Sequence, residues 1–172
     1  MKVLVALDGS TFGENAAAAI APWVRAAGAD VVLMSVLHPG EIQGITANAG
    51  YVYAPAPAVM SRSPEPPPPA LVEDRTQALE RARVETGEYL AGVAAKALPG
   101  VTCEVQVEWS EQTAEAIVRC AQERGANLIA VGTHGRSGIT RALVGSVAEA
   151  VVRRSSVPVF LVRGVEQQAG DD

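Results

Sequence analysis

Segments with the patterns of strands and helices alternate along this chain, and the alternation limits the possible fold more than any other feature. Apolar runs typical of buried strands occupy residues 3–7, 31–37, 128–131 and 157–162. Apolar and polar residues alternate between 101 and 108, as in an edge strand with one polar side. Helical spacing predicts helices over residues 12–27, 71–98, 113–124 and 146–154.

Five strands separated by helices predict an α/β fold, namely an open, Rossmann-like parallel sheet with helices on both faces. The edge pattern of the third strand favours the strand order 3-2-1-4-5. In such a sheet, ligands bind beyond the carboxyl ends of the strands where the winding reverses, here between the first and fourth strands. The crevice would lie between Asp8-Gly9-Ser10 and the loop from Gly132 to Gly138.

The connection after the fourth strand is rich in glycine and leads into the last helix. Its glycines are Gly132, Gly135, Gly138 and Gly145. Glycine lets the backbone approach a ligand, and the first N–H groups of a helix attract anions, so this connection suits a phosphate. It is not a P-loop, because the only lysines of the chain are Lys2 and Lys96. Its spacing also differs from the GxGxxG of dinucleotide-binding folds.

The spacing G-x2-G-x9-G-S, from Gly132 through Gly135 to Gly145-Ser146, resembles the nucleotide-binding signature of the universal stress protein family. The resemblance covers about residues 1–163 apart from 39–70, and it implies the ATP-binding kind of that family. The implied ligand is ATP, with AMP or ADP as alternatives and with Mg²⁺ or Mn²⁺ on the phosphates. It also implies the same strand order.

The resemblance implies a nucleotide site with residues from both halves of the chain. Asp8 would accept hydrogen bonds from ribose hydroxyls or help hold a metal, unless it only forms a turn with Ser10 or caps the helix. Arg136 and Arg141 either neutralise outer phosphates or are solvated. The other implied contacts are Ala6, where the family often has proline, and Ser10, Val36, Val131, Gly132, Gly135, Gly145, Ser146 and Val147. Neither His134 nor His38 has a catalytic partner that the sequence identifies.

The net charge, the apolar segments and the cysteines indicate which kinds of partner the protein can have. A formal net charge of −5 gives no electrostatic footprint for nucleic acid. The apolar run at 3–7 is too short for a signal peptide or a membrane span, so we expect a cytoplasmic protein without membrane insertion. Cys103 and Cys120 lack metal-ligand spacing and are expected to be buried, reduced thiols.

Length predicts one domain over residues 1–163. Residues 39–70 hold eight of the eleven prolines and are expected to form an insertion, either disordered or a partly ordered lid. Residues 164–172 are expected to be a flexible tail. In the first helix, Ser10 or Thr11 is the expected cap. Ile20, Trp23 and Val24 are expected on the packing side, and Pro22 is expected to bend or shorten the last turn.

The expected function is ATP binding in a regulatory role under stress. One alternative is a slow ATP hydrolase or nucleotidyl-transferring enzyme using Asp8 and Arg136, and another is an interaction module whose nucleotide is structural. We predict no catalytic residue, because the sequence offers clear candidates only for binding. The fifth strand, apolar on both faces at a sheet edge, predicts a two-fold homodimer through that strand. The sequence does not identify a protein partner.

Overall fold

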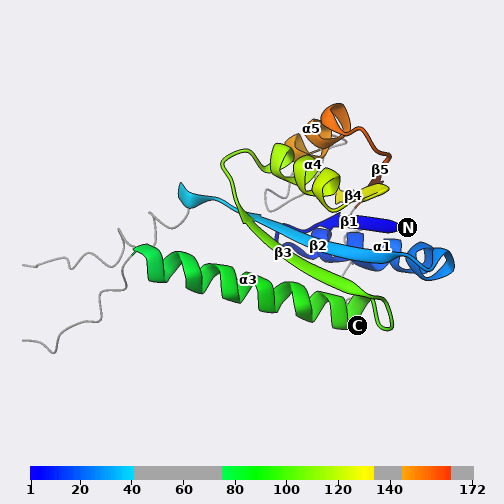
Figure 1. The fold of residues 1–172 in the computed structure, drawn as a ribbon, viewed down its shortest axis with the longest axis horizontal. Helices are drawn as coiled ribbons and strands as arrows, with labels where there is room; N and C mark the ends of the chain where they lie inside the picture. Colours follow the sequence, from blue (N-terminus) through cyan, green and yellow to red (C-terminus); the bar gives the residue numbers. More distant parts are fainter. Residues whose placement is uncertain (41–74, 134–144, 164–172) are drawn as a thin grey trace, which may run out of the picture.

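The computed structural model of the chain describes residues 1–40, 75–133 and 145–163. Within them, parallel strands form one five-stranded sheet in the order β3-β2-β1-β4-β5, so the predicted fold class and strand order are confirmed. The strands are β1 (Lys2–Ala6), β2 (Asp30–Leu37), β3 (Cys103–Trp109), β4 (Leu128–Gly132) and β5 (Val159–Val162). The helices are α1 (Thr11–Ala27), α3 (Arg75–Ala97), α4 (Thr113–Glu123) and α5 (Ser146–Arg154) (Figure 1).

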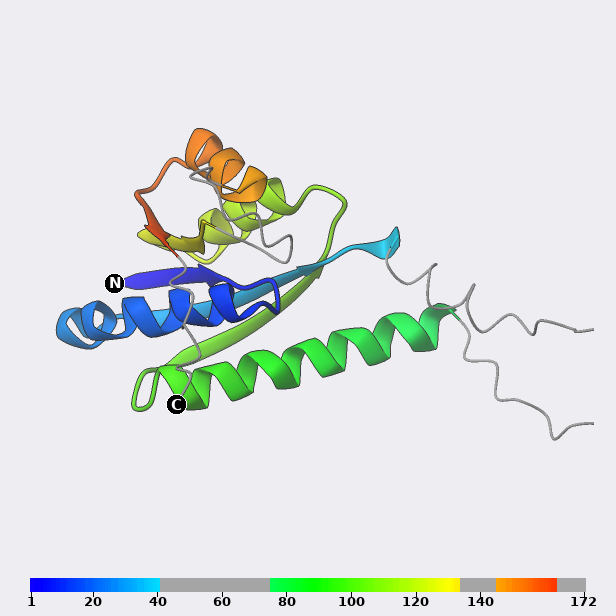
Figure 2. The ribbon, with the colours of Figure 1, turned by 180° about the vertical axis from the view of Figure 1, so that it is seen from behind.

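Each face of the sheet has its own hydrophobic core. Successive residues of a strand point to opposite faces, so Val5 of β1 packs with α1 and α3, whereas Leu4 packs with α4 and α5. Figures 1 and 2 show α4 and α5 together on one side of the sheet and α3 on the other. The crossovers through α1 and α5 therefore lie on opposite faces, and the winding of the chain reverses between β1 and β4.

Two strands begin later than the sequence predicts, because turns occupy their first residues. Before β3, Val101 N donates a hydrogen bond to Leu98 O (3.1 Å) around Gly100, whose φ is 79°. Before β5, the Ser155 hydroxyl donates to Val157 O (2.6 Å) and accepts from Val157 N (3.1 Å). Pro158, which follows, has no N–H to donate to a ladder.

The packing side of α1 differs from the prediction at one residue. Ile20 and Val24 are each 1% exposed, but Trp23 is 68% exposed, so its assignment to the core side was wrong. Three residues turn the helix by about 300°, which places Trp23 about 60° from Ile20 on the side away from Val24. Pro22 does not shorten α1. The helix continues to Ala27 and ends at Gly28, whose φ is 56°.

The polar side of β3 faces α4. Arg124, which directly follows α4, pairs with Glu104 and donates a hydrogen bond to Gln106 Oε1 (2.7 Å), while Arg119 of α4 pairs with Glu108. The apolar residues of this edge strand therefore pack against a hydrophobic core on one face of the sheet, and its polar residues bind arginine side chains on the other face.

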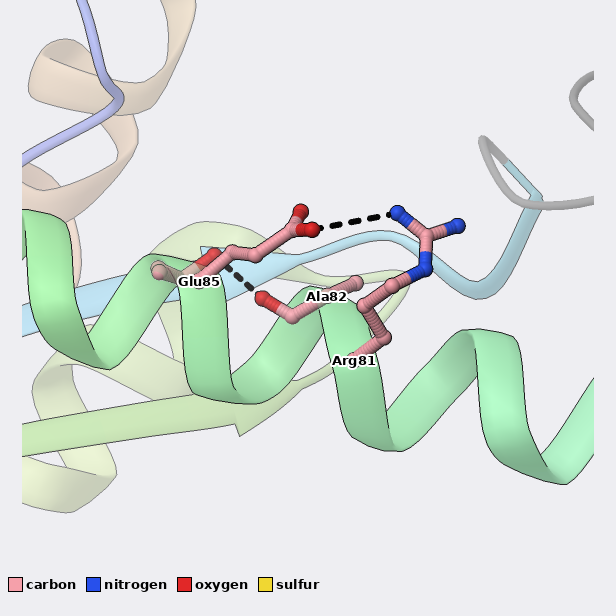
Figure 3. Close-up of polar contacts among 4 residues, drawn as sticks. Arg81, Ala82 and Glu85 are labelled. Atoms are coloured by element: carbon pink, nitrogen blue, oxygen red, sulfur yellow. Dashed lines mark hydrogen bonds and ion pairs between the residues drawn. The ribbon is translucent and has the colours of Figure 1, made fainter.

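Helix α3 carries local pairs along its exposed length. Arg81 Nη1 lies 3.1 Å from Glu85 Oε1 one turn later, and the Thr86 hydroxyl donates to Ala82 O at 2.7 Å (Figure 3). A β-carbon at Gly87 or Gly92 of this helix would meet nothing within 4 Å. No helix of the described ranges combines the length and apolar character needed to cross a membrane.

Both cysteines are free thiols, as predicted, although only Cys120 is buried and Cys103 is half-buried. Cys103 packs against the core of α1 and α3, and Cys120 lies in the core of α4 and α5. The sheet therefore separates the two thiols. Burial raises the pKa of both, and at Cys120 the nearby carboxylate of Glu123 raises the pKa further.

Candidate functional site

The carboxyl ends of β1 and β4 lie side by side where the winding reverses. Ala6, the last residue of β1, is in register with Met34 of β2 on one side and with Val131 of β4 on the other. Ala6 and Val131 are both buried and lie side by side near the carboxyl ends of their strands. The connection after β1 leads to α1 on one face, and α5 follows β4 on the other face. This is the position at which ligands bind in open α/β sheets.

Hydrogen bonds among Asp8, Ser10 and Gly13 fix the start of α1. Asp8 Oδ1 accepts from both the backbone N–H of Ser10 (3.1 Å) and its hydroxyl (2.5 Å). The Ser10 hydroxyl in turn accepts from Gly13 N (3.1 Å), which makes Ser10 the N-cap of α1 as predicted. Asp8 therefore does form a turn with Ser10. The carboxylate is half-buried and held in place at the tip of β1.

Gly13 contacts this hydrogen-bonded group, although the sequence did not predict it as a candidate residue. It is buried in the first turn of α1, and a β-carbon there would lie 2.9 Å from Asp8 Oδ1. The sequence does show a glycine inside an alanine-rich helix. Glycine is unfavourable there unless another group packs too closely to leave room for a side chain. The contact itself could not be read from the sequence.

The start of α5 lies beyond β4, and backbone hydrogen bonds hold it at the end of that strand. Gly145 N donates to Thr133 O (2.7 Å), and Thr133 N donates to Val162 O of β5 (2.9 Å). Gly145 O accepts from Glu149 N (2.9 Å), which begins the helix. A β-carbon at Gly145 would lie 3.0 Å from Thr133 O, so the close approach of these two backbones requires a small residue.

The N-terminus of α5 has no side-chain cap, because its N-cap residue is Gly145. The first N–H groups of a helix have no intrahelical partners, and here they belong to Ser146 and Val147, both of which are exposed. The positive end of the helix dipole lies at the same place. This arrangement can bind an anion, and the Ser146 hydroxyl adds a further donor.

The remaining predicted residues divide into two groups. Val36, near the end of β2, is half-buried against the core of α4 and α5, and Gly132 ends β4. Gly135, Arg136, Arg141 and His134 lie outside the described residues, as do most of the proline-rich segment and the tail at 164–172.

His38 has a hydrogen-bond partner that the sequence did not identify. Its Nε2 lies 3.0 Å from the hydroxyl of Thr113, the first residue of α4. This hydrogen bond connects the residue that follows β2 to the start of α4. Within residues 1–40, 75–133 and 145–163, no group of three or more His, Cys, Asp and Glu side chains could hold a metal ion.

Comparisons with family models and with individual known proteins identify the same family. Residues 1–163 match the universal stress protein family. The chain is 30% identical over 164 residues to the universal stress protein YxiE of Bacillus subtilis (strain 168), which covers 94% of this chain and 98% of that protein.

Two solved structures share the fold over nearly the whole chain. One is a universal stress protein in complex with cAMP, with a TM-score of 0.61, 20% identity, and coverage of 96% of this chain and 98% of that one. The other is the universal stress protein from Archaeoglobus fulgidus in complex with dAMP, with a TM-score of 0.56, 19% identity, and coverage of 94% and 96%. From the match over residues 1–163 and the identity to YxiE, the chain belongs to the universal stress protein family.

Proposed function

We propose that this protein binds ATP, or another adenine nucleotide, in the crevice between the β1–α1 connection and the start of α5. One observation carries the proposal: the uncapped N-terminus of α5 and the fixed carboxylate of Asp8 flank the point where the winding reverses. The structures of similar proteins with cAMP and dAMP support adenine as the base. The glycine spacing from Gly132 to Gly145 supports membership of the ATP-binding kind of the family.

The phosphates would lie at the start of α5, where the N–H groups of Ser146 and Val147 and the Ser146 hydroxyl donate to them. Gly132 and Gly135 would allow the nucleoside to approach the backbone. The adenine would lie toward the ends of β1 and β2, against backbone groups at Ala6 and Val36.

Asp8 would contact either a ribose hydroxyl or a metal ion on the phosphates. Its Oδ1 accepts two hydrogen bonds from Ser10, which fix the orientation of the carboxylate. Mg²⁺ or Mn²⁺ fits this donor set, because such ions are commonly held by one carboxylate and the phosphates themselves. When bound, the ion would neutralise phosphate charge, while Asp8 would orient it.

We further propose that the protein is regulatory and acts as a homodimer under stress. β5 lies at the edge of the sheet, and in the described part of the chain it pairs only with β4. Leu161 on this strand is 38% exposed, and an apolar edge strand is stabilised by pairing with a second copy.

Calorimetric titration of the purified protein with ATP tests the binding proposal. We expect saturable binding that is tighter for ATP than for GTP, because the proposed base contacts are made at an adenine edge. Mass spectrometry of nucleotide that co-purifies would identify the form held in the cell. A titration showing no heat and no saturation with ATP, AMP or ADP would overturn the proposal.

A further inference from the structure

We propose that Gly13 is a positioning residue of the nucleotide site, because it alone leaves room for the Asp8 carboxylate in its observed place. The inference rests on the proposed function, since it concerns how Asp8 is presented to the nucleotide. The glycine-rich signature, which runs from Gly132 to Gly145-Ser146, does not include Gly13.

The contacts around Gly13 single out one atom. A β-carbon at this position would lie 2.9 Å from Asp8 Oδ1, but 3.4 Å from Asp8 N and 3.5 Å from Leu7 Cδ2. The last two distances are ordinary van der Waals contacts, whereas the first is too short for a β-carbon and an oxygen. Any side chain at position 13 therefore displaces the carboxylate before it disturbs the backbone.

Displacing the carboxylate breaks up the hydrogen-bond set at the start of α1. Asp8 Oδ1 would leave the N–H and hydroxyl of Ser10, which now hold it at 3.1 and 2.5 Å. The helix itself would survive, because Gly13 N still donates to the Ser10 hydroxyl and alanine is a better helix former than glycine. Gly13→Ala thus separates the position of Asp8 from the stability of the fold.

The test is calorimetric titration of ATP into wild type, Gly13→Ala, Asp8→Ala and the double variant. We expect Gly13→Ala to weaken ATP binding about tenfold, the lower end of the loss of one hydrogen bond to a charged group. In the Asp8→Ala background, Gly13→Ala should change the affinity by less than about twofold, because the atom it displaces is gone. Gly92→Ala is the matched control, since a β-carbon there meets nothing within 4 Å, and it should bind ATP as wild type does.

The outcomes separate this inference from the proposed function. A wild type that does not bind ATP refutes both. If the wild type binds, equal affinity in Gly13→Ala, or an equal further loss on the Asp8→Ala background, overturns the positioning role alone. Circular dichroism must show Gly13→Ala folded, and an unfolded variant would also contradict the inference. In the nucleotide-free protein, Gly13→Ala should shift the NMR signal of the Asp8 carboxyl carbon, and an unchanged signal would refute the displacement.

Discussion

Replacing Gly145 by alanine should destabilise the protein, although the backbone there is not strained. The φ of Gly145 is −56°, which any residue adopts, so the cost arises from contact alone. The new methyl group would lie 3.0 Å from Thr133 O, and relief requires α5 to move away from β4. That movement weakens the hydrogen bond from Gly145 N to Thr133 O, now 2.7 Å.

Two contributions set the size of the loss. A backbone hydrogen bond contributes about 0.5–1.5 kcal/mol net, and alanine is a poorer N-cap than glycine by roughly 0.5 kcal/mol. We therefore expect the free energy of unfolding to fall by about 1–2 kcal/mol, which for a chain of this length lowers the Tm by about 2–8 °C. Urea unfolding followed by circular dichroism measures the first quantity and calorimetry the second.

Gly92→Ala is the matched comparison, because it replaces an exposed glycine inside α3 whose β-carbon would meet nothing within 4 Å. Helix propensity alone should then raise the free energy of unfolding by about 0.5–1 kcal/mol. Gly145→Ala could instead have the same free energy of unfolding as wild type, or a higher one as expected for Gly92→Ala. Either result would show that the close contact between α5 and β4 does not constrain residue 145.

Three further predictions concern other parts of the molecule. Because burial raises the pKa of both thiols, we expect iodoacetamide to alkylate them slowly at neutral pH, and Cys120 more slowly than Cys103. Rapid labelling of either thiol would contradict this expectation. A folded pKa above the unfolded value also means that the thiols' contribution to stability is present at neutral pH and lost as the pH rises into the alkaline range. Light scattering at micromolar concentration should give a dimer, and Leu161→Glu should give a monomer, whereas a monomeric wild type would refute pairing through β5. Trp23→Gln should change the free energy of unfolding by less than about 0.5 kcal/mol, since its side chain is 68% exposed, and a loss above about 2 kcal/mol would show that something covers it.

The strand order and the adjacent ends of β1 and β4 were predictable because both follow from local patterns. Continuous apolar runs identified the central strands, and the alternation between 101 and 108 identified the edge strand, which left few ways to arrange the sheet. Once the order is fixed, parallel connection places the ends of β1 and β4 side by side. Asp8 and Gly145, which are far apart in sequence, therefore lie beyond the ends of adjacent strands.

The features that the sequence did not predict are contacts between elements. His38 meets Thr113 across 75 positions, and no local pattern records such a pair. Trp23 was misassigned because large apolar residues favour burial on average, while its angle around α1 places it at the margin of the packed face. Gly13 was missed because its close neighbour is Oδ1 of Asp8, and helical spacing does not reveal a contact with a residue outside the helix.

Nucleotide phosphates are proposed to bind at the start of α5, and the ratio of ATP affinity to adenosine affinity is the sharpest test of that position. Ser146→Ala removes a hydroxyl that would donate to a charged phosphate, worth roughly 1.5–3 kcal/mol, so ATP should bind about ten- to a hundred-and-fifty-fold more weakly. Adenosine carries no phosphate and should bind the variant as it binds wild type. Calorimetry with both ligands on both proteins gives the ratio. Equal losses for ATP and adenosine, or no loss for either, would show that the phosphates bind elsewhere.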